Sequence, residues 1–169
     1  PFLFSNRTYF FKTLSSFKKN ILLIPGASFK SKCYPVEKFA EVAREIDANF
    51  LIIWGNQKEK IMADKIKALS PKVIICEKLS LDALISLISQ VDFVLGSDTG
   101  PTHMAWALNK PSITLFGSTP GHRNSYITKN NRIIESNSEV NPYKIDKNDY
   151  SIQDIDVHEI VQVYEELLK

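Results

Sequence analysis

The stretch GSDTGPTHMAWAL, residues 96–108, decides the fold that this sequence predicts. An apolar run over 91–95 precedes it, and a second apolar run over 112–116 follows it. Between the two runs we expect a small-residue turn and a short apolar helix that ends near Asn109. The N-terminus of such a helix can bind an anion, because its unpaired N–H groups and its dipole both favour negative charge. The stretch therefore indicates a protein that binds a phosphate ester or a nucleotide.

Apolar runs alternate with helical patterns along most of the chain. We predict strands at 21–24, 50–54, 73–76, 91–95 and 112–116, and helices at 35–46, 57–69, 80–88, 100–108 and 157–168. Unbroken apolar strands between helices are typical of an α/β protein with a doubly wound parallel sheet, Rossmann-like, in the order 3-2-1-4-5. Residues 117–149 are polar, and we expect them to be irregular. The ligand crevice should lie beyond the carboxyl ends of strands 1 and 4.

The composition is that of an ordinary globular domain and gives no sign of nucleic-acid binding, a metal site or a membrane span. The 169 residues suffice for one domain, with 44% hydrophobic and 24% charged residues, as in ordinary globular chains. A net charge of +2 gives no reason to expect a nucleic-acid partner. Two cysteines without ligand spacing argue for reduced thiols and against a metal site. No apolar run approaches the roughly 20 residues that span a bilayer.

The turns after strands 1 and 4 carry small and phosphate-compatible residues. Lys32, in the first of these loops, could neutralise a diphosphate as a point charge. His103 lies one helical turn beyond Thr99, where it could donate to a phosphate or sugar oxygen. Asp98 should avoid phosphate, and either the helix cap or a sugar hydroxyl is its expected partner. Capping and ligand binding remain open alternatives for this turn.

Glu59 follows strand 2, where an acidic group commonly binds ribose hydroxyls in nucleotide folds. A solvated glutamate in the first turn of a helix is the alternative. The neighbouring cysteine of the first loop, Cys33, could be a reactive thiol, although a buried small side chain is the simpler interpretation. Residues 1–20 are aromatic and basic, and we consider an interdomain linker, an amphipathic membrane patch or a locally packed segment.

Three motifs together resemble one known family. They are SDTGPTHMAWAL with PSITLFGST at 97–119, PGAS with KCYP at 25–35, and Trp54-Gly55. This pattern resembles the bacterial lipopolysaccharide heptosyltransferases of glycosyltransferase family 9, which use ADP-heptose, and type I more than type II. The likeness covers about residues 21–120 and, more loosely, the last helix.

The resemblance implies an inverting glycosyltransferase of the two-domain GT-B type. This chain would be its C-terminal, donor-binding half, with a lead-in over 1–20 and a nucleotide-sugar-binding domain over 21–169. The N-terminal half would bind the lipid A–Kdo acceptor and carry the catalytic base, so we expect no catalytic residue here and no activity of this part alone. Such an enzyme would need neither metal nor cofactor, and would work in the cytoplasm at the inner membrane, with peripheral membrane contact possible.

The same resemblance implies roles for eight residues. Ser28, Lys32, Thr99, Gly100 and His103 would bind the diphosphate, Glu59 the ribose, Leu79 the adenine, and Asp98 the sugar. Two other classes of function remain as alternatives: a sugar-nucleotide epimerase of the same architecture, and a flavodoxin-like interaction module without enzymatic activity.

Overall fold

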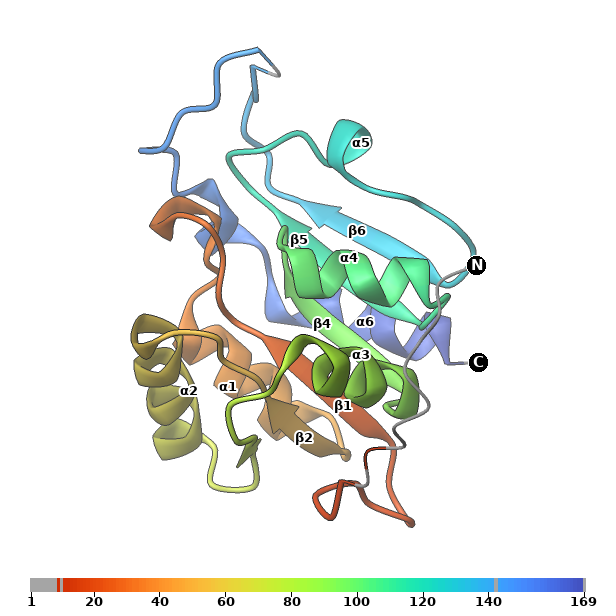
Figure 1. The fold of residues 1–169 in the computed structure, drawn as a ribbon. Coiled ribbons are helices and arrows are strands. Elements are labelled where there is room, and N and C mark those ends of the chain that lie inside the picture. Colours follow the sequence, from red (N-terminus) through yellow and green to blue (C-terminus); the bar gives the residue numbers. More distant parts are fainter. Residues whose placement is uncertain (1–8, 10, 142, 169) are drawn as a thin grey trace.

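The computed structural model describes residues 9, 11–141 and 143–168, and Figure 1 shows them as one parallel sheet with helices on both faces. The sheet has six strands in the order β3-β2-β1-β4-β5-β6. Their bounds are β1 Asn20–Ile24, β2 Asn49–Ile52, β3 Ile74–Ile75, β4 Phe93–Ser97, β5 Ser112–Phe116 and β6 Asn131–Glu135. All five pairings are parallel. The predicted α/β class and the predicted order of the first five strands are confirmed.

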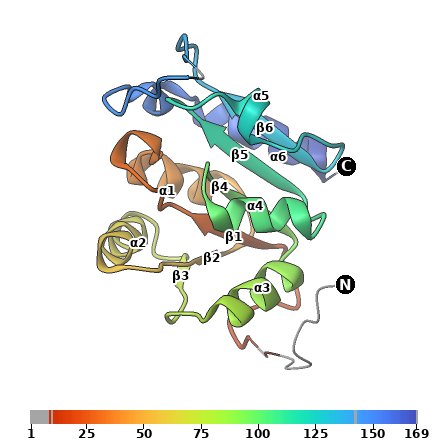
Figure 2. The same ribbon diagram turned by 45° about the horizontal axis from the view of Figure 1, so that its top comes forward.

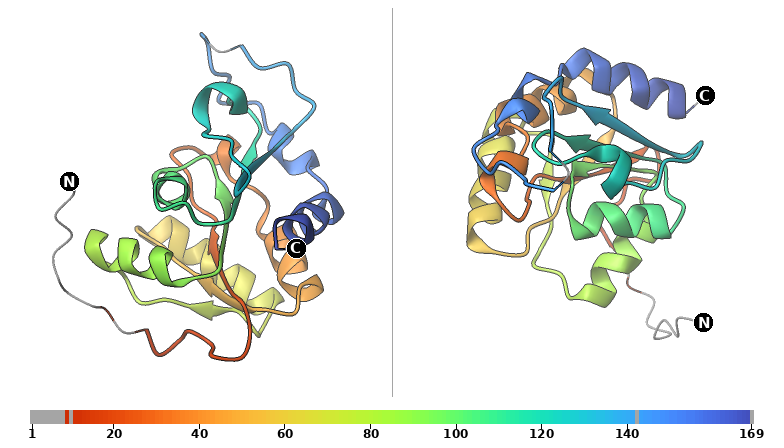
Figure 3. Two further views of the ribbon diagram at one scale, coloured as in Figure 1. Left: turned by 90° about the vertical axis from the view of Figure 1, so that its right-hand side faces the viewer. Right: turned by 90° about the horizontal axis from the view of Figure 1, so that it is seen from above.

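The helices cover the two faces in two groups (Figure 3, left). They are α1 Val36–Glu45, α2 Gln57–Leu69, α3 Leu81–Gln90, α4 Gly100–Ala107, α5 Gly121–Asn124 and α6 Val157–Leu167, with short 3-10 helices η1 Lys30–Lys32 and η2 Ser151–Asp154. Residues of α1, α2 and α6 share one core cluster, and residues of α3 and α4 share the other. Figure 2 shows the sheet running between these groups.

The central strand β1 separates the two cores. Ile21 and Leu23 belong to the cluster under α1 and α6, whereas Leu22 and Ile24 belong to the cluster under α3 and α4. All four side chains are at most 3% exposed. This two-sided burial explains why the strand is apolar throughout rather than alternating with polar residues.

The polar region after β5 departs from our expectation. It contains the short helix α5 and the edge strand β6, where we expected irregular structure. Sequence reasoning missed β6 because only Asn131 and Ile134 are buried in it, so no apolar run marks the strand. Asn131 secures the strand, since its side-chain amide donates to the Lys110 carbonyl oxygen and the Ser112 hydroxyl.

Helix α2 contacts the core through only part of its apolar residues. Ala63 and Ile66 are buried, whereas Ile61 and Leu69 are exposed. Alanine can lie closest to the sheet because it is small, and the neighbouring larger side chains then point outward.

The lead-in is described only at residues 9 and 11–19, and the remainder of 1–20 lies outside the described residues. Phe11 and Leu14 pack against the core under α3, and the Gln90 amide donates to the Tyr9 carbonyl oxygen. Asn20, which we assigned to the lead-in, is the first residue of β1. Within the described ranges, no helix is long and apolar enough to cross a bilayer.

The close contact between β4 and α4 gives a stability prediction. A Cβ atom at Gly96 would lie 2.7 Å from the Thr102 hydroxyl oxygen and 3.1 Å from the Ile24 carbonyl oxygen. Gly96→Ala should therefore lower the free energy of unfolding by about 1–3 kcal/mol, measured by urea denaturation. Gly100→Ala is the control, because nothing lies within 4 Å of the added atom. Equal stability of the two variants would contradict this packing.

Candidate functional site

The candidate site forms where the loops after β1, β4 and β5 meet. The loop after β1 turns through η1, whose last residue is Lys32. The Lys32 ammonium nitrogen lies 2.5 Å from Oδ2 of Asp98, the first residue after β4. These side chains are only 11% and 6% exposed. The two turns that the sequence singled out are therefore in direct contact, as the predicted strand order requires.

The Asp98 carboxylate binds groups from three segments. Besides Lys32, the His103 Nε2 atom lies 2.9 Å from Oδ1, and the Thr119 hydroxyl donates to Oδ2 over 3.1 Å. Burial favours the neutral acid and is the largest single influence, but the hydrogen bonds from His103 and Lys32 outweigh it with the charge of Lys32 and the Thr119 hydroxyl. The pKa of Asp98 is lowered as a result. Asp98 is thus a buried, ionised carboxylate with both oxygens occupied.

The start of α4 corrects one of the alternatives for this turn. The N-cap is Thr99 rather than Asp98, and its side chain makes no capping hydrogen bond. The Thr102 hydroxyl is buried and donates to the Ser97 carbonyl oxygen, so it does not face the mouth of the site. Pro101 has no N–H, and the His103 N–H donates to the Thr99 carbonyl oxygen. The backbone N–H groups of Gly100 and Thr102 thus remain for an anion.

His103 is held at this mouth by two neighbours. Its ring stacks on Trp106, with ring centroids 4.2 Å apart and an interplanar angle of 20°. The Trp106 indole N–H in turn donates to the Thr114 hydroxyl on β5, over 3.2 Å. Because Nε2 faces an ionised carboxylate, the proton must be on Nε2. The His103 side chain is 42% exposed, so part of the ring stays accessible to a ligand.

Glu59 lies across the end of β1. Its Oε2 accepts from the Gly55 N–H over 2.6 Å, and the Asn56 side chain accepts from the Glu59 N–H over 3.1 Å. A Cβ atom at Gly26 would lie 2.5 Å from the Glu59 Cδ atom, so a larger residue there would displace this side chain. Glu59 therefore lies in the first turn of α2, as one of our alternatives states, but its carboxylate is bound to the Gly55 N–H rather than only solvated. The arrangement also holds its second oxygen beside the site.

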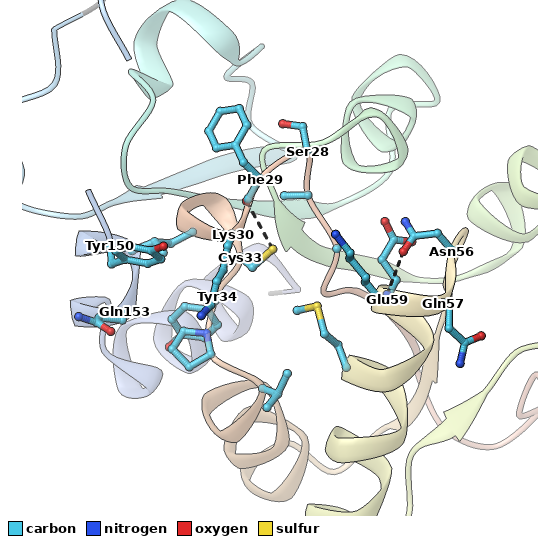
Figure 4. A pocket seen from close by; sticks show the side chains of 17 residues that line it. Ser28, Phe29, Lys30, Cys33, Tyr34, Asn56, Gln57, Glu59, Tyr150 and Gln153 are labelled. Atoms are coloured by element: carbon cyan, nitrogen blue, oxygen red, sulfur yellow. Dashed lines mark hydrogen bonds between the residues drawn. The ribbon is translucent and has the colours of Figure 1, made fainter. Parts of the chain in front are cut away.

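A pocket with a volume of about 950 Å³ adjoins these loops (Figure 4). Ser28 and Glu59 line this pocket, and the other six residues that we singled out are not part of its lining. Lys32, Asp98, Thr99, Gly100 and His103 surround the neighbouring mouth at α4, whereas Leu79 packs against the core under α3. The binding roles of all eight residues remain predictions.

Sequence reasoning missed Thr119, although it lies in the quoted FGST segment. The signal was available, because β5 is the neighbour of β4 and both carboxyl ends reach the same edge of the sheet. Tyr150 and Gln153, which line the pocket, were not predicted either, because no local sequence pattern distinguishes them. Burial raises the pKa of the Cys33 thiol, which disfavours the reactive-thiol alternative. Among the residues described, no cluster of three or more His, Cys, Asp or Glu could hold a metal.

Because the pKa of Asp98 is lowered, the free energy of unfolding should depend on pH. A carboxylate whose folded pKa is lowered stabilises the fold fully above its unfolded pKa of about 3.9, and this contribution disappears as the pH falls through the folded value. Asp98→Asn should lower the free energy of unfolding by roughly 1–3 kcal/mol at pH 7, and the loss should shrink below about pH 4. Urea denaturation at several pH values measures this. Asp64→Asn, at an exposed residue of α2, is the control, and the same loss at every pH would contradict the assignment.

With this geometry in place, comparisons identify relatives. The pattern of glycosyltransferase family 9 (heptosyltransferase) matches residues 5–151. Lipopolysaccharide heptosyltransferase 1 of Campylobacter coli is 38% identical over 164 residues, which cover 91% of this chain and 48% of that relative. Lipopolysaccharide heptosyltransferase 2 of Escherichia coli K12 is 31% identical over 114 residues, 62% of this chain and 33% of that relative. The matched part of the chain corresponds to 48% of the first relative and 33% of the second, so the chain spans about half the length of these relatives or less.

Solved structures agree on the fold. E. coli ADP-heptose LPS heptosyltransferase II has a TM-score of 0.77 at 23% identity, covering 92% of this chain and 48% of that chain. E. coli heptosyltransferase WaaC with ADP has a TM-score of 0.75 at 21% identity, covering 89% and 44%. The family match favours the glycosyltransferase interpretation over the epimerase and the interaction module. The buried contact between the β1 and β4 loops thus lies in a chain that belongs to glycosyltransferase family 9, the heptosyltransferases.

Proposed function

We propose that this chain is the donor-binding half of an inverting heptosyltransferase, and that it binds ADP-heptose at the carboxyl ends of β1 and β4. One observation supports this above all: the buried contact between Lys32 and Asp98 brings the ammonium to the N-terminus of α4. A cation beside unpaired backbone N–H groups suits a diphosphate. A relative with this fold, WaaC, has been solved with ADP and with an ADP-heptose analogue.

The diphosphate would replace one partner of Lys32 with another. In the free protein the ammonium lies against Asp98, so the two charges compensate each other. A bound diphosphate would accept from Lys32 and from the N–H groups of Gly100 and Thr102, while the carboxylate keeps His103 and Thr119 as donors. Asp98 then repels the phosphates but can accept hydrogen bonds from sugar hydroxyls, which agrees with the role that the family resemblance implies.

The remaining predicted contacts involve the ribose, the phosphates and the adenine of ADP. Glu59, whose carboxylate is held by the Gly55 N–H, would accept from the ribose hydroxyls, and Ser28, which lines the adjoining pocket, would contact the phosphates. Leu79 would approach the adenine from the loop between β3 and α3. These assignments require that Leu79 present part of its half-buried side chain to the base.

In the transfer step, an acceptor hydroxyl oxygen would attack the anomeric carbon of the heptose, and the bond from that carbon to the ADP oxygen would break. Lys32 and the start of α4 would stabilise the negative charge that develops on ADP, without a metal ion. We assign the base that takes the hydroxyl proton, and the lipid A–Kdo acceptor, to the half of the enzyme that this chain does not include. The type I reaction, at the cytoplasmic face of the inner membrane, is part of this proposal.

Binding of ADP tests the donor site directly. Isothermal titration calorimetry should show that this chain binds ADP and ADP-heptose but not UDP-sugars. Lys32→Ala should weaken ADP binding by about tenfold or more, the size of a lost charge-assisted hydrogen bond. Lys65→Ala, an exposed lysine on α2, is the matched control. No heat with ADP in the unaltered chain would refute the proposal.

Turnover of the full-length enzyme gives a second test. Lys32→Ala should lower kcat by at least about an order of magnitude, as expected for the loss of a group that stabilises developing charge. Heptose transfer to a lipid A–Kdo acceptor under saturating substrates measures this effect. Unchanged kcat and KM would remove Lys32 from the mechanism.

A further inference from the structure

The loop after β1 separates the pocket from the contact between Lys32 and Asp98. Figure 4 shows Lys30, Cys33 and Tyr34 along one wall with Tyr150 and Gln153, and Asn56, Gln57 and Glu59 along the opposite wall. The walls come from the loop after β1, the start of α2 and the segment around η2. This cavity of about 950 Å³ is large enough for a small organic molecule.

The interior of the pocket is largely apolar. Val36, Met62 and Ile152 line it, together with the aromatic residues Phe29 and Tyr34. The Tyr34 side chain is fully buried, and its hydroxyl donates to the Ile155 carbonyl oxygen over 3.0 Å, so this residue forms a fixed part of the wall. Ile152 packs closely against the backbone of Gly117, the residue after β5, because a Cβ atom at Gly117 would lie 2.6 Å from the Ile152 Cβ atom. The pocket is thus a preformed site for an apolar body.

Positive charge surrounds this apolar interior. Lys30 and Lys58 both line the pocket, and neither forms an ion pair with any carboxylate that the structure describes. The Lys147 ammonium lies 5.6 Å from the centroid of the Phe29 ring, which adds a third cation near the rim. Among the described residues that line the pocket, Glu59 is the one with a carboxylate, and the Gly55 N–H already occupies one of its oxygens.

Two helix N-termini strengthen the same preference. The first residues of α1 and α2, Val36 and Gln57, both line the pocket, and these helices have 10 and 13 residues. The N-cap of α1 is Pro35, which makes no side-chain cap, so backbone N–H groups of its first turn stay unpaired. Both helix dipoles therefore add positive potential at a cavity that already has unpaired lysines.

We propose that this pocket is a second binding site, separate from the diphosphate mouth, and that it takes an amphipathic organic anion. The apolar body of the ligand would lie on Val36, Met62 and Ile152, and its phosphate, sulfonate or carboxylate head would lie between Lys30 and Lys58. Ser28 and Glu59, which we predict to contact the diphosphate and the ribose, also line this pocket. Lys32, Asp98, Thr99, Gly100 and His103 are not among its lining residues, and Lys32 is turned to Asp98 instead. The proposal does not rest on the function proposed above.

Anilinonaphthalenesulfonate, an apolar ring system with one anionic group, is the probe. Its fluorescence should rise on saturable binding to this chain, and Lys30→Gln with Lys58→Gln should weaken binding about tenfold. Lys65→Gln, on the same helix but outside the pocket, is the matched control for the charge change. Met62→Trp, which fills the cavity and leaves both lysines, should also abolish the signal. A thermal melt of each variant verifies that it is folded.

Competition defines the ligand class. Octyl phosphate should displace the probe, whereas octyl glucoside, which has the same chain without charge, and inorganic phosphate alone should not. Displacement by octyl glucoside as well would show that the ligand needs no anionic group. Unchanged binding of the probe to the double lysine variant and to Met62→Trp would show that the probe does not bind in this pocket. Saturating ADP should leave the probe bound. Displacement by ADP at the concentration at which ADP itself binds would show that the cavity is part of the nucleotide site, and the second site would be rejected.

Discussion

The buried carboxylate of Asp98 is the constraint on which the arrangement of this site depends. A charge that is 5% exposed is stable only when donors surround it, and the donors here come from three different segments. Lys32 belongs to the loop after β1, His103 to α4 and Thr119 to the loop after β5. Any displacement of one loop would leave the carboxylate short of a partner, so the three loops are fixed relative to one another.

This arrangement also determines how the site can respond to an anion. Since the positive charge of Lys32 is compensated by Asp98, the free site contains no unpaired charge from this lysine. In the proposed complex, a phosphate group would recruit the ammonium while His103 and Thr119 continue to donate to the carboxylate. The unpaired N–H groups at the start of α4 would then provide a second set of donors at a fixed distance from the first. The same few side chains would thus provide both binding and preorganisation.

The sequence predicts the sheet well because the first five strands are apolar and two-sided burial leaves an unambiguous pattern. It fails at β6, where an edge strand needs only Asn131 and Ile134 inside. The contact of Lys32 with the α4 turn follows from the strand order. The partners of Asp98 do not, because a local pattern favours the helix cap equally and only the folded loops bring Thr119 within reach. Tyr150 lines the pocket through a contact across more than a hundred residues, which periodicity does not encode.

The proposed donor site requires that the start of α4 and Lys32 bind the same diphosphate. Amide nitrogen and proton shifts of the ¹⁵N-labelled chain during titration with ADP, compared with adenosine, measure this most directly. We expect ADP, and not adenosine, to shift the backbone amide signals of Gly100 and Thr102 saturably, and we expect Lys32→Ala to weaken this response. ADP shifts confined to other loops, with the amides of Gly100 and Thr102 unmoved at saturation, would contradict the proposed donor site.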